Sequence, residues 1–393
     1  MAAEIAAGHD ARRRLRLGLV GGGPGAFIGA VHRIAARLDD RFEIVAGALS
    51  ADPDRSRAAA RDLRIAPERA YGSYAEMAAA EAARPDPIDA VAIVTPNHLH
   101  HAVATAFLAA GIHVFCEKPM TVTVAEALDL AASVRRTGLV FGLAHTYTGY
   151  PLVRQARAMV AAGMLGAIRV VQVEYAQDWL ATPLEATGHK QAAWRTDPAL
   201  SGPAGCLGDI ATHAYHLAGF VSGLTCRALA AELSSFVPGR RIDDNVQVLL
   251  RFAEGARGAL WASQVAPGNA NNLRIRLYGE KAGLEWHQEA PDHLWFTPLG
   301  EPTRAIRRGG AGADAAAAHA TRLPAGHPEG YLEAFAQLYA DLAEQIEARR
   351  EGRAPDPTAL LVPSVEAGVE SARFVAAALD SSRRDAAWIA LSL

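Results

Sequence analysis

The stretch LGLVGGG, from Leu17 to Gly23, joins an apolar run to a cluster of glycines. Residues 15–20 have the continuous apolar character of a buried strand, and residues 28–38 have the pattern of an amphipathic helix. Glycines between a strand and a helix let the backbone approach a pyrophosphate closely, and the N-terminus of the helix supplies N–H donors. The stretch therefore predicts a dinucleotide-binding turn at the start of a Rossmann-type fold.

The glycines match the pattern G-x-G-x-x-G incompletely. Gly21 and Gly23 take its first two positions, but Ala26 stands where the third glycine belongs. Alternatively, Gly29 is the third glycine and residues 24–26 form an insertion. Because a strand precedes the turn and a helix follows it, a dinucleotide site is favoured over a tight turn in an unrelated α/β protein.

The pattern of strand followed by helix continues outward from this turn. Strands are predicted at 15–20, 42–49, 90–95 and 112–116, and helices at 28–38, 54–63, 74–83 and 100–110. This alternation is typical of a parallel sheet with right-handed crossovers, whose strands are buried on both faces. We therefore predict an NAD(P)-binding Rossmann domain over residues 15–147, preceded by a flexible tail at 1–14.

The remaining residues, 148–393, have a different pattern. A helix is predicted at 152–162, strands at 168–175, 227–233, 245–252, 258–264, 273–278 and 283–287, a mobile loop at 300–326, and helices at 328–349 and 365–379. Short glycine-containing turns between strands indicate an α+β domain with an open, mostly antiparallel sheet. We expect the domain over 148–393 to bind substrate and to form oligomers. Its C-terminal part, 328–393, can pack back on the Rossmann domain.

Composition excludes several classes of protein. The 393 residues carry a formal net charge of −3, which gives no argument for a nucleic-acid partner. No window approaches the ~20 apolar residues of a membrane span. Cys116, Cys206 and Cys226 lack C-x-x-C spacing, so a reducing cytoplasm is favoured over a disulfide or zinc framework. Arg12–Arg14 precede only a short apolar run, which favours a solvated tail over an export signal.

The end of the second strand normally distinguishes NAD from NADP. An acidic residue there holds the ribose 2′-hydroxyl of NAD, whereas an arginine accommodates the 2′-phosphate of NADP. Ser50 takes that position here, Asp52 is placed to cap the next helix, and Arg55 can reach a phosphate or lie on a solvated helix face. The residues themselves leave the choice between the two cofactors open.

Further motifs lie in both halves of the chain: TPNHLH at 95–100, EKP at 117–119, WR at 194–195 and GPAGCLGDIATH at 202–213. Together they closely resemble the glucose–fructose oxidoreductase / inositol dehydrogenase / rhizopine catabolism (Gfo/Idh/MocA) family, over essentially the whole chain. The inserted glycine turn and the stretches 147–151 and 175–179 resemble a longer subgroup, some of whose members act on inositols or on hexoses such as L-glucose.

This resemblance implies an NAD(P)-dependent dehydrogenase that oxidises a secondary hydroxyl of a cyclitol or sugar to a ketone or lactone. It implies NAD as the preferred cofactor, with NADP possible, and a homodimer or homotetramer built on the open sheet. Two alternatives remain: a redox-assisted glycosidase or glycoside 3-dehydrogenase that retains its NAD, and a non-catalytic binding protein. The joint presence of Lys118, Asp209 and His213 argues against the last.

By the same resemblance, Lys118, Asp209 and His213 are the expected catalytic residues. Asp209 and His213 are four residues apart, so they share one face of a helix. A histidine can accept the hydroxyl proton, and the aspartate can orient it or bind a sugar hydroxyl. Spacing alone favours a helix-capping aspartate and a core histidine, and the resemblance is what favours the catalytic roles. Lys118 ends a strand, where ligands of open α/β sheets bind, although a surface lysine is the alternative.

The expected contacts fall into two sets. Cofactor contacts are expected at Gly21, Gly23, Pro24, Ala26, Phe27, Ile28, Ser50, Thr95, Asn97, His100, Glu117, Lys118, Trp194 and Arg195. Substrate contacts are expected at Lys118, Tyr147, Asp178, Asp209, His213 and His327, with Trp179 a weaker candidate. Trp194 can instead anchor a domain interface, and His327 can instead cap a helix. We expect no metal site, because the histidines at 98–101 have no nearby carboxylate.

Overall fold

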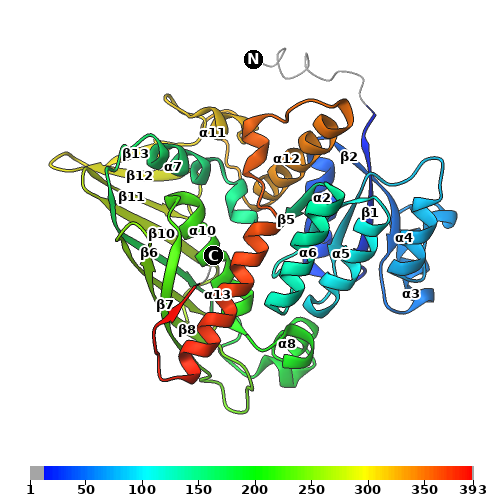
Figure 1. The fold of residues 1–393 in the computed structure, drawn as a ribbon, viewed down its shortest axis with the longest axis horizontal. Helices are drawn as coiled ribbons and strands as arrows, with labels where there is room; N and C mark the ends of the chain where they lie inside the picture. The colour runs from blue at the N-terminus through cyan, green and yellow to red at the C-terminus, as the bar shows by residue number, and fades with distance from the viewer. Residues whose placement is uncertain (1–12, 392–393) are drawn as a thin grey trace.

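The computed structural model describes residues 13–391, which form two sheets joined by helices (Figure 1). The first sheet has five parallel strands in the order β2-β1-β3-β4-β5. Its strands are β1 (Leu15–Gly21), β2 (Phe42–Ala48), β3 (Ala90–Val94), β4 (His113–Cys116) and β5 (Phe141–Leu143). The strand order reverses between β1 and β3, so their carboxyl ends border the crevice in which open α/β sheets bind ligands.

Helices on both faces bury this sheet, as the predicted crossovers require. They include α2 (Phe27–Leu38), α3 (Pro53–Asp62), α4 (Tyr74–Ala82), α5 (His100–Ala109) and α6 (Val124–Thr137). We did not predict α6 or β5. The three residues of β5 are too few to show periodicity, but α6 has a readable signal: Thr123 and Glu126 form a capping box, and Gly138 ends the helix with φ 63°.

The second sheet has nine strands in the order β13-β12-β11-β10-β6-β9-β8-β7-β14. They are β6 (Ile168–Ala176), β7 (Cys226–Ser234), β8 (Asn245–Phe252), β9 (Arg257–Ser263), β10 (Asn272–Gly279), β11 (Ala282–His287), β12 (His293–Pro298), β13 (Arg304–Arg307) and β14 (Ile389–Ala390). All neighbours pair antiparallel except β6 and β9, which are parallel. The predicted fold class, a Rossmann domain followed by an open and mostly antiparallel sheet, is confirmed.

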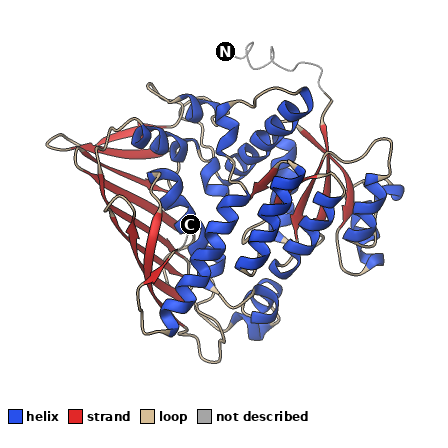
Figure 2. Cartoon of the chain, in the orientation of Figure 1, coloured by secondary structure: helices blue, strands red, loops and turns tan. Residues whose placement is uncertain are grey.

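One face of the nine-stranded sheet is packed and the other is open (Figure 2). Helices α7 (Pro151–Ala161) and α10 (Thr212–Ser222) cover the inner face, and no helix of the described residues covers the outer one. Strand β8 shows the consequence, because Val246 and Val248 are buried whereas Leu249 is exposed. This alternation is the one that a half-buried strand requires.

The C-terminal helices lie between the two sheets (Figure 1). Helix α12 (Tyr331–Glu351) packs against α2, and α13 (Val365–Arg383) packs against α6. Phe335 and Leu342 of α12 share one apolar cluster with strand residues such as Leu15. Both helices therefore bury apolar surface of the dinucleotide domain, so the two domains meet over an extended contact.

The predicted loop at 300–326 is more ordered than its sequence suggests. It contains β13 and the helix α11 (Ala315–His319). The side chain of Arg308 is buried and donates to Asp292 (2.6 Å) and Glu329 (2.8 Å). The prediction of a loop over the whole range is therefore wrong. Ion pairs from Arg308 to distant residues hold the segment, and no local periodicity reveals such pairs.

Short elements complete the described chain. They are α8 (Lys190–Arg195), α9 (Pro198–Ser201), the π-helical turn η5 (Leu207–Ala211), and the 3₁₀ turns η1 (Pro67–Arg69), η2 (Asn97–Leu99), η3 (Thr146–Gly149), η4 (Leu184–Thr187) and η6 (Pro357–Leu361). Among residues 13–391, no helix combines the length and apolar character needed to cross a bilayer. Most of the predicted N-terminal tail, residues 1–12, lies outside the described residues.

Candidate active site

A cavity of about 600 Å³ lies at the carboxyl edge of the parallel sheet, between the two domains. From the Rossmann domain it is lined by Phe27, Ile28, Thr95, Asn97, His100, Glu117 and Lys118. The later part of the chain contributes Tyr147, Tyr175, Gln177, Trp179, Gln191, Trp194, Arg195, Asp209, His213, Asn271, Gln288 and Tyr331, among others. Most of the predicted site residues thus line this one cavity.

The glycine turn has the close packing that a pyrophosphate cradle needs. Gly21 has φ 78°, which favours glycine, and a Cβ on Gly23 would lie 2.5 Å from the carbonyl oxygen of Leu49. A Cβ on Gly29 would lie 2.3 Å from the carbonyl oxygen of Gly22. Gly29 therefore lets α2 approach the turn, which is the packing role of the third glycine.

Residues 24–28, between Gly23 and Gly29, differ in whether they line the cavity. Ala26 is the N-cap of α2 and makes no side-chain capping bond. Phe27 and Ile28 line the cavity, whereas Pro24 lies in the turn beside it. Together with the glycine packing, this open helix N-terminus fits a dinucleotide phosphate group.

Lys118 and Asp209 meet at the centre of the cavity. The Lys118 ammonium donates to Oδ1 of Asp209 at 3.0 Å and to the backbone carbonyl of the same residue at 2.6 Å. Lys118 follows β4, whereas Asp209 lies in the π-helical turn η5, so this contact links the two domains. Single π-helical turns frequently occur at functional sites, and here the turn presents a carbonyl and a carboxylate to one ammonium group.

Two further residues hold the carboxylate of Asp209. Gln264 donates to Oδ2 at 2.8 Å, and Nε of Arg195 lies 3.5 Å from the same oxygen. Burial disfavours the charged carboxylate, but Lys118 and Arg195 outweigh it and hold the pKa of Asp209 well below its usual range. Asp209 therefore stays ionised at neutral pH and acts as an acceptor and positioning group.

His213 lies one turn after Asp209, at the start of α10. Burial, followed by the nearby Lys118, lowers the pKa of His213 well below its usual range, so the ring is neutral. It makes no hydrogen bond to any described residue, and its Nδ1 is buried without a partner. The alternatives of a capping aspartate and a satisfied core histidine therefore do not describe this pair.

A buried carboxylate sets the position of the turn that carries Asp209. Asp243 accepts hydrogen bonds from the backbone N–H groups of Gly205 (2.7 Å) and Leu207 (2.6 Å). A Cβ on Gly205 would lie 2.1 Å from the Asp243 carbonyl oxygen, so only glycine fits there. Burial raises the pKa of Asp243 to about 6. We did not predict this anchor, because it comes from a loop far along the chain.

Glu117 connects the end of β4 to two helices. Its Oε1 lies 3.0 Å from Nε2 of His32 on α2, and the other ring nitrogen of His32 lies 2.6 Å from the hydroxyl of Tyr339 on α12. Its Oε2 accepts from the backbone N–H of Lys118 at 3.0 Å. Glu117 therefore fixes the strand end that carries Lys118.

Residues after β3 form the adjoining wall. The His100 ring bridges the carbonyl oxygens of Thr95 (2.9 Å) and Pro119 (2.7 Å), and burial lowers its pKa. Asn97 donates to the carbonyl of Ser201 at 3.0 Å, across the domain boundary. The Thr95 hydroxyl is buried without a partner at the cavity wall, where a bound dinucleotide can satisfy it. Within the described residues, no cluster of three or more His, Cys, Asp or Glu side chains is arranged to hold a metal ion.

The opposite wall is a chain of uncharged polar groups. The hydroxyls of Tyr147 and Tyr175 contact each other, and Tyr175 donates to Asn271 at 2.7 Å. Gln177 also donates to Asn271 at 2.7 Å, and Gln288 lies 3.3 Å from its amide nitrogen. Only Tyr147 was predicted as a contact here. The alternation of positions 175 and 177, at the end of β6 and just beyond it, is a signal in the sequence, whereas Asn271 and Gln288 show none.

Helix α8 brings Trp194 and Arg195 over the cavity. Both side chains donate to Oε1 of Gln191, at 3.2 and 2.5 Å, and the Arg195 guanidinium lies 4.3 Å from the centre of the Trp194 ring. Trp194 lines the cavity, and Arg195 also reaches Asp209. These positions favour a ligand contact over a purely structural interface anchor.

Besides the glycine-turn residues Gly21, Gly23, Pro24 and Ala26, the predicted contacts Ser50, Asp178 and His327 do not line the cavity. The Ser50 hydroxyl accepts from the backbone N–H of Asp52, in the turn after β2. Asp178 accepts from the backbone N–H of Gly268, because its neighbours 177 and 179 occupy the inward-facing positions. His327 is exposed and lies four residues before α12, so it neither enters the cavity nor caps that helix. The structure thus places Asp178 and His327 outside the cavity, whereas Ser50, in the turn after β2, stays a prediction of a cofactor contact.

The fold and the site together define a two-domain oxidoreductase whose N-terminal domain binds a dinucleotide. Residues 15–145 match a family model described as "Oxidoreductase family, NAD-binding Rossmann fold", and residues 153–285 match the GFO/IDH/MocA C-terminal domain. The chain belongs to the Gfo/Idh/MocA family, which confirms the resemblance and the predicted Rossmann fold.

Similar proteins include enzymes of known substrate. An oxidoreductase from Sinorhizobium meliloti is 51% identical, with a TM-score of 0.88 over 96% of this chain and 100% of that one. An inositol dehydrogenase homolog from Azotobacter vinelandii, solved with NAD⁺, is 38% identical, with a TM-score of 0.91 over 96% and 97% of the two chains. Levoglucosan dehydrogenase from Pseudarthrobacter phenanthrenivorans is 31% identical over 72% of this chain and 76% of that protein.

Proposed function

We propose that this protein is an NAD-dependent dehydrogenase that oxidises a secondary hydroxyl of a cyclitol or sugar, such as an inositol or a hexose, to the ketone or lactone. The observation that carries this proposal is the Lys118–Asp209 pair beside an unpartnered His213 in the interdomain cavity. Relatives support the substrate class: the Azotobacter homolog has been solved with NADH and myo-inositol, and levoglucosan dehydrogenase with NADH and levoglucosan.

Each of the three side chains has a separate task. When bound, NAD⁺ accepts the hydride from the carbinol carbon. Lys118 gives two N–H groups to Asp209 and keeps a third, which can hold the substrate oxygen. His213 is neutral and can accept the hydroxyl proton, while Asp209 keeps the ammonium in place.

The charges of the cavity suit a neutral substrate. Among the described lining residues, the charged groups Glu117, Lys118, Arg195 and Asp209 comprise two anions and two cations. Lys118 and Arg195 are both close to Asp209, so part of their positive charge is already compensated before a substrate binds. The polar wall around Asn271 offers hydroxyl and amide groups instead, which match the donors and acceptors of a polyol.

NAD(H) is the proposed cofactor rather than NADP(H). Asp52 caps α3 by accepting from the N–H groups of Asp54 and Arg55, so its carboxylate is already engaged. The choice therefore rests on the relatives, which were solved with NAD⁺ or NADH. We also propose a cytoplasmic location, since the three cysteines are buried and free.

The test is an activity matrix of NAD⁺ and NADP⁺ against inositols, D- and L-hexoses and simple glycosides. We expect stoichiometric reduction of NAD⁺ with at least one polyol, and a loss of about 10²–10⁴-fold in kcat/KM for Lys118→Ala. Asp178→Asn, outside the cavity, is the matched control and should retain activity. Failure to reduce either cofactor across the panel contradicts the proposal, and glycoside cleavage without net reduction indicates the glycosidase alternative.

A further inference from the structure

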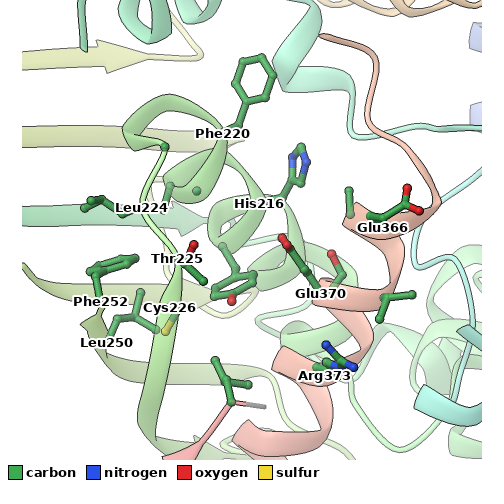
Figure 3. A pocket seen from close by; sticks show the side chains of 18 of the residues that line it. His216, Phe220, Leu224, Thr225, Cys226, Leu250, Phe252, Glu366, Glu370 and Arg373 are labelled. Carbon is green, nitrogen blue, oxygen red and sulfur yellow. The ribbon is translucent and has the colours of Figure 1, made fainter. Parts of the chain in front are cut away.

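A second cavity, of about 570 Å³, lies between α6, α10, α13 and the ends of β7 and β8 (Figure 3). Apolar side chains such as Phe252 and Leu224 line one side of it. Glu366, Glu370 and Arg135 line it and are themselves exposed, so the cavity opens to solvent. The proposed dehydrogenase function assigns no role to this cavity.

Three histidine rings connect the two cavities. His213 lines the catalytic cavity, and His216, one turn later on α10, lines the second. His145 lies between them with 1% of its surface exposed. Its ring centre is 5.4 Å from that of His213 and 4.1 Å from that of His216, on which it stacks within 6° of parallel. The three rings therefore form a continuous file from one cavity to the other.

Polar atoms along this file lack the partners that buried groups normally have. Nδ1 of His145 and Nδ1 of His213 are both buried without a hydrogen bond to any described residue. Nε2 of His145 lies 3.4 Å from the hydroxyl of Ser371, which also lines the second cavity. Two adjacent histidines with unsatisfied nitrogens are costly for stability alone, so a functional role accounts for them better.

Oxidation of an alcohol supplies a reason for such a file. Breaking the substrate O–H bond releases one proton per turnover, while the C–H hydride goes to NAD⁺. The cofactor and the substrate together occupy the catalytic cavity, so a proton accepted by His213 needs a route that avoids them. The second cavity is open to water and lies on the other side of the histidines.

We propose that His145 and His216 carry this proton from His213 to solvent in the second cavity, an inference that rests on the proposed dehydrogenase function. His213 accepts the proton on its cavity-facing nitrogen and releases one from Nδ1 toward His145, directly or through one bound water. His145 passes a proton on toward Ser371 and His216, and water in the second cavity takes it up. Each ring ends neutral but with its proton on the other nitrogen, and a ring flip or a proton returned along the file restores the starting tautomers before the next turnover.

The surroundings of the three histidines disfavour their protonated form, so a proton is passed on and does not stay on a ring. His145 is faced by Lys118 and by the other two histidines, and burial followed by these groups lowers its pKa well below the usual range. Burial and the nearby Arg157 lower the pKa of His216 to about 3. Across the second cavity, the facing charged groups are Arg135 on α6 and Glu366, Glu370 and Arg373 on α13. Glu366 and Glu370 are exposed and can accept a proton.

The experiment compares proton release with hydride transfer in a single turnover of the holoenzyme in weak buffer. A pH indicator follows the proton, and cofactor absorbance follows the hydride. In the wild type we expect the two signals to rise together. In His216→Ala we expect proton release to lag by about tenfold or more, and added imidazole, small enough to enter the cavity, to remove the lag.

Phe220→Leu is the matched control, because Phe220 packs against His216 in the same cavity but cannot carry a proton. It should show no lag. His145→Gln provides a second variant, which should lag without rescue because imidazole cannot reach a ring that is 1% exposed. Proton release that keeps pace with hydride transfer in both histidine variants overturns the proposal. Absence of hydride transfer in the wild type instead refutes the dehydrogenase function itself.

Discussion

Lys118 reaches two oxygens of one residue, and this contact determines what the site can do. An ammonium that donates to both the carbonyl and the carboxylate of Asp209 has one N–H left, and its direction is set by the other two. Gln264 and Arg195 hold the far oxygen of the same carboxylate. At the scale of single residues, the geometry therefore depends on partners that hold Asp209 as much as on Lys118.

The role of Gln264 can be tested directly. Replacing it by Leu removes a hydrogen bond to a charged group, worth about 1.5–3 kcal/mol, so we expect kcat/KM to fall by about 10–100-fold. The affinity for NAD should change little, because Gln264 does not line the cavity. Steady-state kinetics and a cofactor titration measure the two quantities. An unchanged kcat/KM would show that Asp209 needs no support from Gln264.

At the scale of elements, the close packing of α2 against the glycine turn requires that residue 29 has no side chain. A Cβ on Gly29 would lie 2.3 Å from a backbone oxygen, so Gly29→Ala must push α2 away from the turn. We expect it to weaken NAD binding and to destabilise the protein by about 2 kcal/mol. Gly330→Ala is the control, because a Cβ there meets no atom within 4 Å. Equal NAD affinity and stability in the two variants would contradict this account.

The pairing of β4 with its neighbour predicts a pH dependence of stability. Val140 donates its N–H to Nδ1 of His113 at 2.9 Å, and burial, with Arg349 nearby, lowers the pKa of His113 to about 4. The unfolded chain binds this proton more readily, so stability is lost as the pH falls below about 6.5. By pH 5 the loss from His113 is on the order of 2 kcal/mol.

His113→Asn isolates this contribution. The amide oxygen can still accept from Val140 but does not titrate, so the free energy of unfolding of the variant should fall less between pH 7 and pH 5 than that of the wild type. Urea denaturation at the two pH values gives the difference. Parallel losses in the two proteins would mean that His113 is not the group that titrates.

The elements also show what the sequence can reveal. Periodicity predicted most strands and helices, because each pattern is contained within its own segment. It missed β5, which is too short, and also α6 and β12. It also missed the order within 300–326, which depends on the distant partners of Arg308. Lys118 and Asp209 lie in recognisable local patterns, whereas Gln264 and Asn271 come from strand ends whose place at the cavity only the folded sheet defines.

At the scale of the whole molecule, the open face of the nine-stranded sheet points to self-association. Leu249, Trp295 and Tyr278 are 55%, 43% and 43% exposed. We propose that this face joins copies of the chain into a dimer or tetramer. Leu249→Lys should then reduce the mass measured by light scattering, whereas Leu360→Lys, at an exposed position on η6, should not. A wild-type monomer at micromolar concentration would contradict the proposal.

The proposed dehydrogenase transfers a hydride from a substrate carbinol carbon to NAD⁺ within the Lys118–Asp209–His213 site. The most direct test uses a substrate of the activity matrix labelled with deuterium at its carbinol carbons, reacted with NAD⁺ in a single turnover. We predict that mass spectrometry finds the deuterium in the reduced cofactor with the wild type, and that Lys118→Ala forms this product about 10²–10⁴ times more slowly. Reduced cofactor without deuterium, or an undiminished rate in Lys118→Ala, would contradict the account.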